Sequence, residues 1–180
     1  MEGNYFELLQ LRKMDEEVTQ LAAYNKNTMR FDLALSEQEA KELVVARNTS
    51  LKVHQRVEMG KGILERLIYH FCDSQYINQD NYAQTLMRLT DIFYLFKNES
   101  MDKLSDEELL IFMKEQFETV CTGDVEHLAD TCLERFSRAI RSGYRGFEKS
   151  GGHGEYEHFD EEERWDKDLY MQVAKELFWG

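Results

Sequence analysis

The 180-residue chain contains no proline. Proline interrupts helices and is common in turns, and average usage would place about nine prolines in a chain of this length. Its absence favours long helices and disfavours collagen-like, proline-linker and turn-rich β architectures. No uncharged apolar run approaches the roughly 20 residues that a membrane-spanning helix needs. We therefore expect an all-α protein without a membrane segment.

Apolar side chains recur at intervals of three and four over most of the chain, as they do on the buried face of a helix. The first such segment covers residues 5–24. Its predicted buried stripe comprises Phe6, Leu8, Leu9, Leu11, Met14, Val18, Leu21 and Ala22. Capping boxes at 36–39 and 105–108, each a serine followed by a glutamate three residues later, predict two further helix starts. Together these patterns predict an irregular bundle of about six helices.

One short segment has a different periodicity. Apolar residues alternate with other residues at Met29, Phe31, Leu33 and Leu35. A period of two indicates extended backbone, but a single short strand is not stable alone. We therefore expect either a short extended connector with one face packed inward or part of a minimal hairpin.

The C-terminal part differs in composition from the rest. Five of the ten glycines lie at 143–154, which predicts a flexible linker over 143–158 after a helical bundle domain at 1–142. An amphipathic helix is expected at 159–180. Its apolar stripe consists of Trp165, Leu169, Tyr170, Val173, Leu177 and Phe178. Tryptophan and tyrosine are good anchors for docking into a protein groove, whereas the acidic opposite face disfavours membrane binding. The helix therefore docks either on its own bundle or on a partner, which is another protein or a second copy.

Charge and cysteine usage restrict the compartment and the partners. The formal net charge of −13 disfavours nucleic acid, which requires clustered Lys and Arg. The first residues lack the features of a secretory signal, so we expect a cytoplasmic protein. The three cysteines, Cys72, Cys121 and Cys132, form no CxxC pair and fall at apolar positions of helical patterns. Each is expected to be a buried free thiol.

Arg47 is the first candidate for a binding site. It occupies a position on the predicted second helix where an apolar residue is expected, and a buried guanidinium needs a carboxylate or several carbonyls. Glu58 is a possible partner. A functional interpretation is a clamp for an anionic ligand built from Arg47, His54 and Arg56. The alternative is a structural ion pair, or a side chain whose stem covers the stripe while its guanidinium reaches water.

Two further motifs carry weaker signals. His153, Glu155 and His158 could ligate a divalent metal ion, but they lie in the predicted glycine-rich linker, which would not preorganise a site. Gly60-Lys61-Gly62 could hold a phosphate at a helix N-terminus, although no P-loop pattern surrounds it. We expect no cofactor and no bound metal.

Two stretches of the chain resemble a known family. They are Ala46-Arg47-Asn48-Thr49-Ser50-Leu51, continuing through 56–64, and Phe93-Tyr94-Leu95-Phe96-Lys97-Asn98-Glu99-Ser100, followed by 104–109. Together they resemble an uncharacterised family of bacterial cytoplasmic proteins, a domain of unknown function, over about 35–142. The resemblance implies no activity and transfers no catalytic residue.

The sequence leaves several functional classes open. No nucleophile elbow, zinc-protease motif or kinase signature is present. The expected function is therefore a non-catalytic, cytoplasmic protein–protein interaction module. The alternatives are a small enzyme or anionic-ligand sensor using Arg47, His54 and Arg56, or a helical protein that binds a divalent metal.

Overall fold

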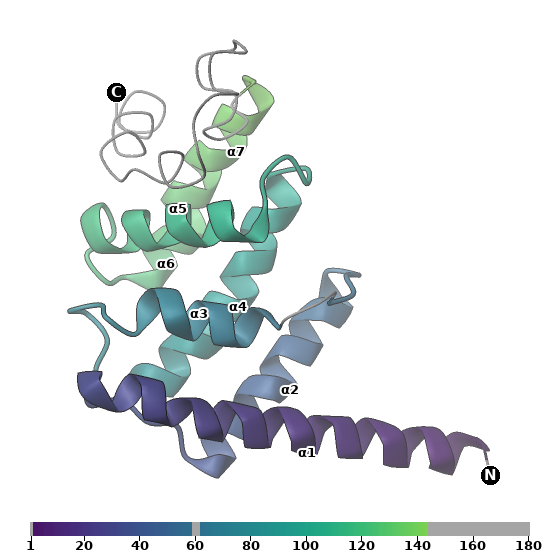
Figure 1. Cartoon of the computed structure of the whole chain (residues 1–180). Helices are drawn as coiled ribbons and strands as arrows, with labels where there is room; N and C mark the ends of the chain where they lie inside the picture. Colours follow the sequence, from purple (N-terminus) through teal and green to yellow (C-terminus); the bar gives the residue numbers. More distant parts are fainter. Residues whose placement is uncertain (1, 59–61, 144–180) are drawn as a thin grey trace, which may run out of the picture. The chain divides into compact units, whose positions relative to one another are not determined.

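A computed structural model describes residues 2–58 and 62–143, and within these ranges all regular structure is helical. The elements are α1 (Glu2–Thr28), η1 (Met29–Phe31), α2 (Glu37–Val53), α3 (Ile63–Phe71), α4 (Tyr82–Glu99), α5 (Asp106–Thr119), α6 (Val125–His127), η2 (Leu128–Cys132) and α7 (Leu133–Arg141). The last three are continuous along the chain, because the π-helical η2 joins α6 to α7. Counted in this way, the described residues form six helices and one short 3-10 turn, which confirms the predicted all-α fold (Figure 1).

The chain divides into two compact units, Met1–Tyr94 and Leu95–Gly180, with the boundary inside α4. The expected division into a bundle, a linker and a terminal helix concerns mainly residues outside the described ranges, and it stays a prediction.

The predicted helix starts are present and are held by side-chain caps. The Ser36 hydroxyl accepts a hydrogen bond from the Glu39 backbone amide at 3.0 Å, and the Glu39 carboxylate accepts one from the Ser36 amide at 2.9 Å. Ser105 likewise accepts from the Glu108 amide at 3.1 Å, but its hydroxyl donates to the Glu108 carboxylate. Both serines therefore satisfy amides that the first helical turn would leave unpaired.

The connector between α1 and α2 agrees with the prediction only in its second half. Met29 and Phe31 belong to the 3-10 turn η1, so the extended backbone predicted there is wrong. Leu33 and Leu35 are buried as expected, and no hairpin forms in the described part of the chain. The chain leaves the 3-10 turn through Asp32, which adopts a left-handed conformation with a φ of 59°.

Two side-chain amides replace the neighbouring strand that this connector lacks. Asn25 donates to the Leu35 carbonyl and accepts from the Leu35 amide, both at 2.8 Å. Gln79 makes the same pair of bonds with Ala34, at 2.8 and 2.9 Å. Because the backbone polar groups of both residues are satisfied, a single extended segment can pack on a helical core without a sheet.

The core of the first unit is formed by apolar faces of α2, α3 and the first part of α4. The fully buried residues of this core include Leu43, Phe71, Tyr82, Leu86 and Phe93. Burial of each such side chain contributes roughly 1.5–3 kcal/mol before the entropy of ordering is subtracted.

The first half of α1 does not follow the prediction. The helix packs through residues such as Val18 and Leu21, which are buried, whereas Phe6, Leu8, Leu9 and Leu11 are exposed. Figure 1 shows the reason, since the N-terminal turns of α1 extend past α2. The spacing of the apolar residues therefore predicted the helix correctly, but the predicted burial of its first turns is wrong.

The second unit is organised around three aromatic rings. Phe96 of α4, Phe112 of α5 and Phe136 of α7 are buried, with ring centroids 5.1–5.8 Å apart. These separations lie in the range that aromatic pairs favour. The last described helix, α7, ends at Arg141, and Gly143 follows two residues later with a φ of 106°, which suits a residue without a side chain.

Candidate functional site

Arg47 is buried in α2, at a position where the apolar periodicity of the helix predicts an apolar residue. Its neighbours on the same face, Ala40, Leu43 and Val44, are fully buried, and Arg47 itself is 4% exposed. A guanidinium in this position requires charged or polar partners, because an unpaired buried charge is costly.

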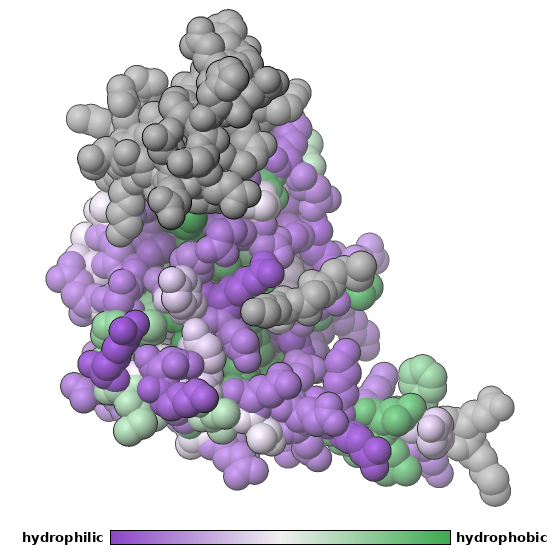
Figure 2. Space-filling model, viewed as in Figure 1, coloured by the Kyte–Doolittle hydropathy of each residue, from purple (hydrophilic) through white to green (hydrophobic). Residues whose placement is uncertain are grey.

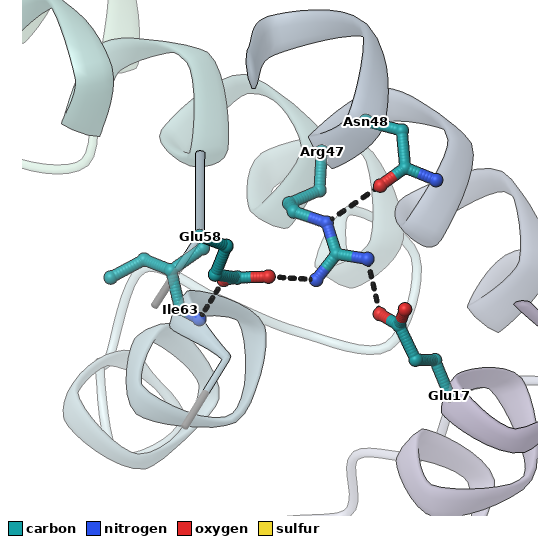
Figure 3. A network of polar contacts seen from close by, with 5 residues as sticks. All are labelled: Glu17, Arg47, Asn48, Glu58 and Ile63. Carbon is teal, nitrogen blue, oxygen red and sulfur yellow. Dashed lines mark hydrogen bonds and ion pairs between the residues drawn. The ribbon is translucent and has the colours of Figure 1, made fainter. Parts of the chain in front are cut away.

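Two carboxylates supply that pairing (Figure 3). The Nη1 group of Arg47 donates to Glu58, and the Nη2 group donates to Glu17 of α1. The Nε group donates to the side-chain oxygen of Asn48 at 2.9 Å. The prediction that Glu58 is a possible partner of Arg47 thus agrees with this geometry. Glu17 was missed, since nothing near it in sequence indicates that it faces a residue thirty positions away.

Glu58 connects this network to α3. Its second oxygen accepts a hydrogen bond from the backbone amide of Ile63, the first residue of α3, at 2.6 Å. The preceding residue, Gly62, offers no side-chain cap. Glu58 therefore takes the place of an N-cap while it also neutralises part of the Arg47 charge.

His54 belongs to a neighbouring polar cluster. Its Nε2 lies 3.1 Å from Oδ1 of Asp91 on α4, and its ring stacks on that of Tyr94 at a centroid distance of 6.1 Å. Ser50 also donates to Oδ1 of Asp91, at 3.2 Å. Serine, histidine and aspartate are thus close together, but the carboxylate lies between the other two. A nucleophilic relay requires the histidine in that central position, so this arrangement does not provide one.

The charges around Arg47 disfavour an anionic ligand. One guanidinium faces two carboxylates, which leaves a formal local charge of −1. An incoming anion would have to displace a bonded carboxylate and would meet like charge. Arg56, the third member of the predicted clamp, is half-buried. The geometry at Arg47 therefore supports the structural interpretation, in which the arginine is an ion-paired part of the core.

The remaining predicted sites fall outside the described residues. These are the metal candidates His153, Glu155 and His158, residues Gly60 and Lys61 of the phosphate motif, and the docking stripe Trp165, Leu169, Tyr170, Val173, Leu177 and Phe178. Within 2–58 and 62–143, no group of three or more His, Cys, Asp or Glu side chains is arranged to hold a metal ion. None of the helices in these ranges has the length and apolar character needed to cross a bilayer.

Several large apolar side chains are exposed close together in sequence at the beginning of α1. We define the α1 apolar end as Tyr5, Phe6, Leu8, Leu9 and Leu11, which are 45–67% exposed. Figure 2 shows these hydrophobic residues gathered near the N-terminus. Tyr5, Leu8 and Leu9 have the i, i+3, i+4 spacing that places side chains on one helix face. Grouped apolar exposure is typical of interaction sites, whereas isolated apolar residues on a surface are common and need no explanation.

These features define an all-α protein with a saturated internal ion-pair network and an exposed apolar helix end. A family model, described as a family of unknown function (DUF6323), matches residues 20–146, and the chain belongs to that family. The match confirms the predicted membership of an uncharacterised family and extends beyond the predicted span on both sides. No curated protein and no solved structure gives a significant match.

Proposed function

We propose that this protein is a non-catalytic, cytoplasmic interaction module that binds through the α1 apolar end. The observation that supports this function is the exposure of five large apolar side chains within the first three turns of one helix. A helix that presents apolar residues on several sides is normally covered by protein. Covering them would remove apolar area from water, and each large side chain contributes up to roughly 1.5–3 kcal/mol.

We commit to a second copy of the same chain as the partner. Other large apolar residues that are exposed, such as Met29, Val53, Val57 and Tyr69, are separated on different segments of the described chain. The surface on one copy that best matches the α1 apolar end is therefore the same end of another copy. A two-fold pairing uses one patch on both subunits and needs no separate groove. Antiparallel packing of the two helix ends would bring Tyr5, Leu8 and Leu9 of each copy against those of the other.

An enzyme or anion sensor at Arg47 receives less support. Its guanidinium is already bonded to Glu17, Glu58 and Asn48, and the local charge is negative. Pairing through an apolar helix end requires no cofactor. It also requires no nucleic acid, which the net charge of −13 disfavours as a partner.

The test is sedimentation velocity of the full chain over a range of concentrations. We expect the wild-type protein to show a concentration-dependent monomer–dimer equilibrium. The double variant Leu8→Glu/Leu9→Glu should remain monomeric over the same range, because it would place four carboxylates in the contact. Its thermal midpoint, measured where the wild type is monomeric, should be unchanged, since both residues are exposed.

A matched control separates the apolar contact from the added charge. The double variant Val53→Glu/Val57→Glu introduces the same two charges in the same unit, at residues that are 68% and 82% exposed. It should dimerise like the wild type. A wild-type chain that stays monomeric at every concentration, or a Leu8→Glu/Leu9→Glu variant that still dimerises, would reject pairing through this surface.

A further inference from the structure

Two of the three cysteines lie in contact inside the second unit. The Sγ atoms of Cys121 and Cys132 are 3.4 Å apart, and both residues are buried. A disulfide has an S–S distance of about 2.05 Å, so bond formation requires the two sulfurs to approach by roughly 1.4 Å. Small rotations of the two side chains supply displacements of this size. Cys72 lies in the first unit.

Local backbone features bring these sulfurs together. Cys121 follows α5 in a tight turn, in which Thr122 and Gly123 adopt left-handed conformations with φ values of 46° and 88°. The turn is closed by a hydrogen bond from the Asp124 amide to the Cys121 carbonyl at 3.0 Å. Asp124 then caps the next helix by accepting from the amides of Glu126 and His127. The chain thus reverses direction directly after Cys121.

The partner cysteine is the last residue of the π-helical segment η2, Leu128–Cys132. A π turn holds one more residue than an α turn, and it rotates the next helical turns by about 100° relative to an uninterrupted α-helix. Both ends of the segment, Leu128 and Cys132, face the core. Single π turns of this type occur frequently at functional sites.

We propose that Cys121 and Cys132 form a reversible disulfide site, which hydrogen peroxide oxidises and small thiols reduce. Disulfides in reducing compartments are usually transient and serve a redox-sensing or catalytic role. This site lies within one unit and is independent of the α1 apolar end, so the inference goes beyond the proposed function.

The reaction balances with peroxide as the oxidant. The Cys132 thiolate attacks one peroxide oxygen, the O–O bond breaks, and a sulfenic acid and hydroxide are formed; the hydroxide takes up a proton to give water. The Cys121 sulfur then attacks the sulfenic sulfur, the S–O bond breaks, and the S–S bond forms with loss of a second water. In total, two thiols lose two hydrogen atoms and one peroxide molecule becomes two waters. Reduction by a small thiol proceeds through thiol–disulfide exchange.

The surroundings distinguish the roles of the two thiols. The hydrogen bond between the two thiols, together with the positive charge of Arg135, lowers the pKa of Cys132, against the effect of its burial. The same hydrogen bond, burial and the nearby Asp124 carboxylate raise the pKa of Cys121. These directions favour Cys132 as the thiol that attacks peroxide and Cys121 as the one that resolves the sulfenic acid.

The turn at Cys121 provides access to the buried sulfurs. A left-handed conformation is unfavourable for a β-branched residue such as Thr122. This strain raises the energy of the closed turn and reduces the cost of opening it. Transient opening of the segment from Cys121 to Asp124 would expose both thiols to peroxide.

The experiment uses the full chain and tryptic peptide mapping. Cys121 and Cys132 fall in one peptide, residues 115–135, and Cys72 falls in another, residues 67–88. After treatment of the native protein with hydrogen peroxide and alkylation in denaturant, peptide 115–135 should lose both alkylation sites and the mass of two hydrogen atoms. Dithiothreitol should restore both sites. Cys72 should remain alkylated throughout and serves as the internal control.

Single variants test the order of the two steps. In Cys121→Ser, peroxide should leave Cys132 as a sulfenic acid that dimedone traps. In Cys132→Ser, the same dose should leave Cys121 alkylatable. If peptide 115–135 of the wild type keeps both alkylation sites, the proposal is overturned, as it is by a disulfide joining either cysteine to Cys72.

Discussion

The carboxylate of Glu17 in α1 pairs with the guanidinium of Arg47 in α2, thirty residues further along the chain. The same guanidinium pairs with Glu58, which also bonds the first amide of α3. One buried cation therefore connects α1, α2 and the start of α3. Because breaking a buried pair costs more than breaking an exposed one, we expect Arg47 to contribute more to the stability of the first unit than the surface ion pairs do.

Removal of the Arg47 side chain should strongly destabilise the fold. Arg47→Ala leaves two carboxylates facing each other without a cation, and breaking a buried pair typically costs about 3–5 kcal/mol. Urea unfolding followed by circular dichroism measures this loss. The matched control is Arg138→Ala, which removes an exposed i, i+4 pair with Glu134 and should cost at most about 1 kcal/mol. Equal effects of the two substitutions would contradict the structural role of Arg47.

The two carboxylates that contact Arg47 should not be equivalent. Glu17 contributes an ion pair, whereas Glu58 also takes the role of the N-cap of α3. We therefore expect Glu58→Ala to cost about 1 kcal/mol more than Glu17→Ala, the usual loss when an N-cap is removed. Urea unfolding of the two variants under the same conditions gives this difference directly. A larger loss for Glu17→Ala would show that the cap contributes little.

Gly62 should tolerate a side chain. Its φ of −63° and ψ of 146° are accessible to any residue. A methyl group would lie 3.5 Å from the Glu58 carboxylate and 3.7 Å from the Arg47 guanidinium, which are ordinary contacts. Gly62→Ala should therefore change the stability by less than about 1 kcal/mol, because alanine reduces the freedom of the unfolded chain but is less favourable than glycine at the N-cap position that Gly62 occupies. A larger loss of stability, measured from the thermal midpoint, would mean that the methyl group disturbs the ion-pair network.

Tyr82 should make the first unit sensitive to alkali. Burial raises the pKa of its phenol above the ordinary value, Cys72 and Tyr24 add to this effect, and the hydrogen bond with Thr28 opposes it. Because the folded-state pKa is raised, the stability from the neutral phenol is complete below about pH 10 and falls as the pH rises further. Tyr82→Phe should therefore reduce the loss of thermal midpoint above about pH 10. Identical alkaline profiles for the two proteins would contradict this assignment.

Local sequence signals predicted much of the fold. The serine and glutamate at 36–39 are sufficient for a capping box because all of the atoms involved lie within one turn. Arg47 was identifiable as buried because its apolar neighbours share one helix face. Glu58 could be predicted as a partner of Arg47 because it follows the end of the same helix by only a few residues.

Features that depend on tertiary contacts were not accessible in this way. An apolar helix face is buried only where another element packs against it. The first turns of α1 extend past α2, so Leu8 and Leu11 are exposed although their spacing is helical. The alternation from Met29 to Leu35 gave no indication that Asn25 and Gln79 would replace a partner strand. The contact between Cys121 and Cys132 depends on a turn and on a π segment, and the π segment does not disturb the apolar pattern visibly.

The π-helical segment Leu128–Cys132 also has an evolutionary consequence. Such a segment is the expected result when a helix absorbs a single inserted residue without forming a loop. Relatives whose ancestors lacked the insertion would be one residue shorter between Asp124 and Phe136 and would still have the same number of helices. Because the wider turn takes up the extra residue, the helix on either side of it keeps its orientation, and the turns after this point would face the core in the shorter chains as they do here. A gap of one position at this point in an alignment would therefore mark chains in which this helix is α-helical throughout.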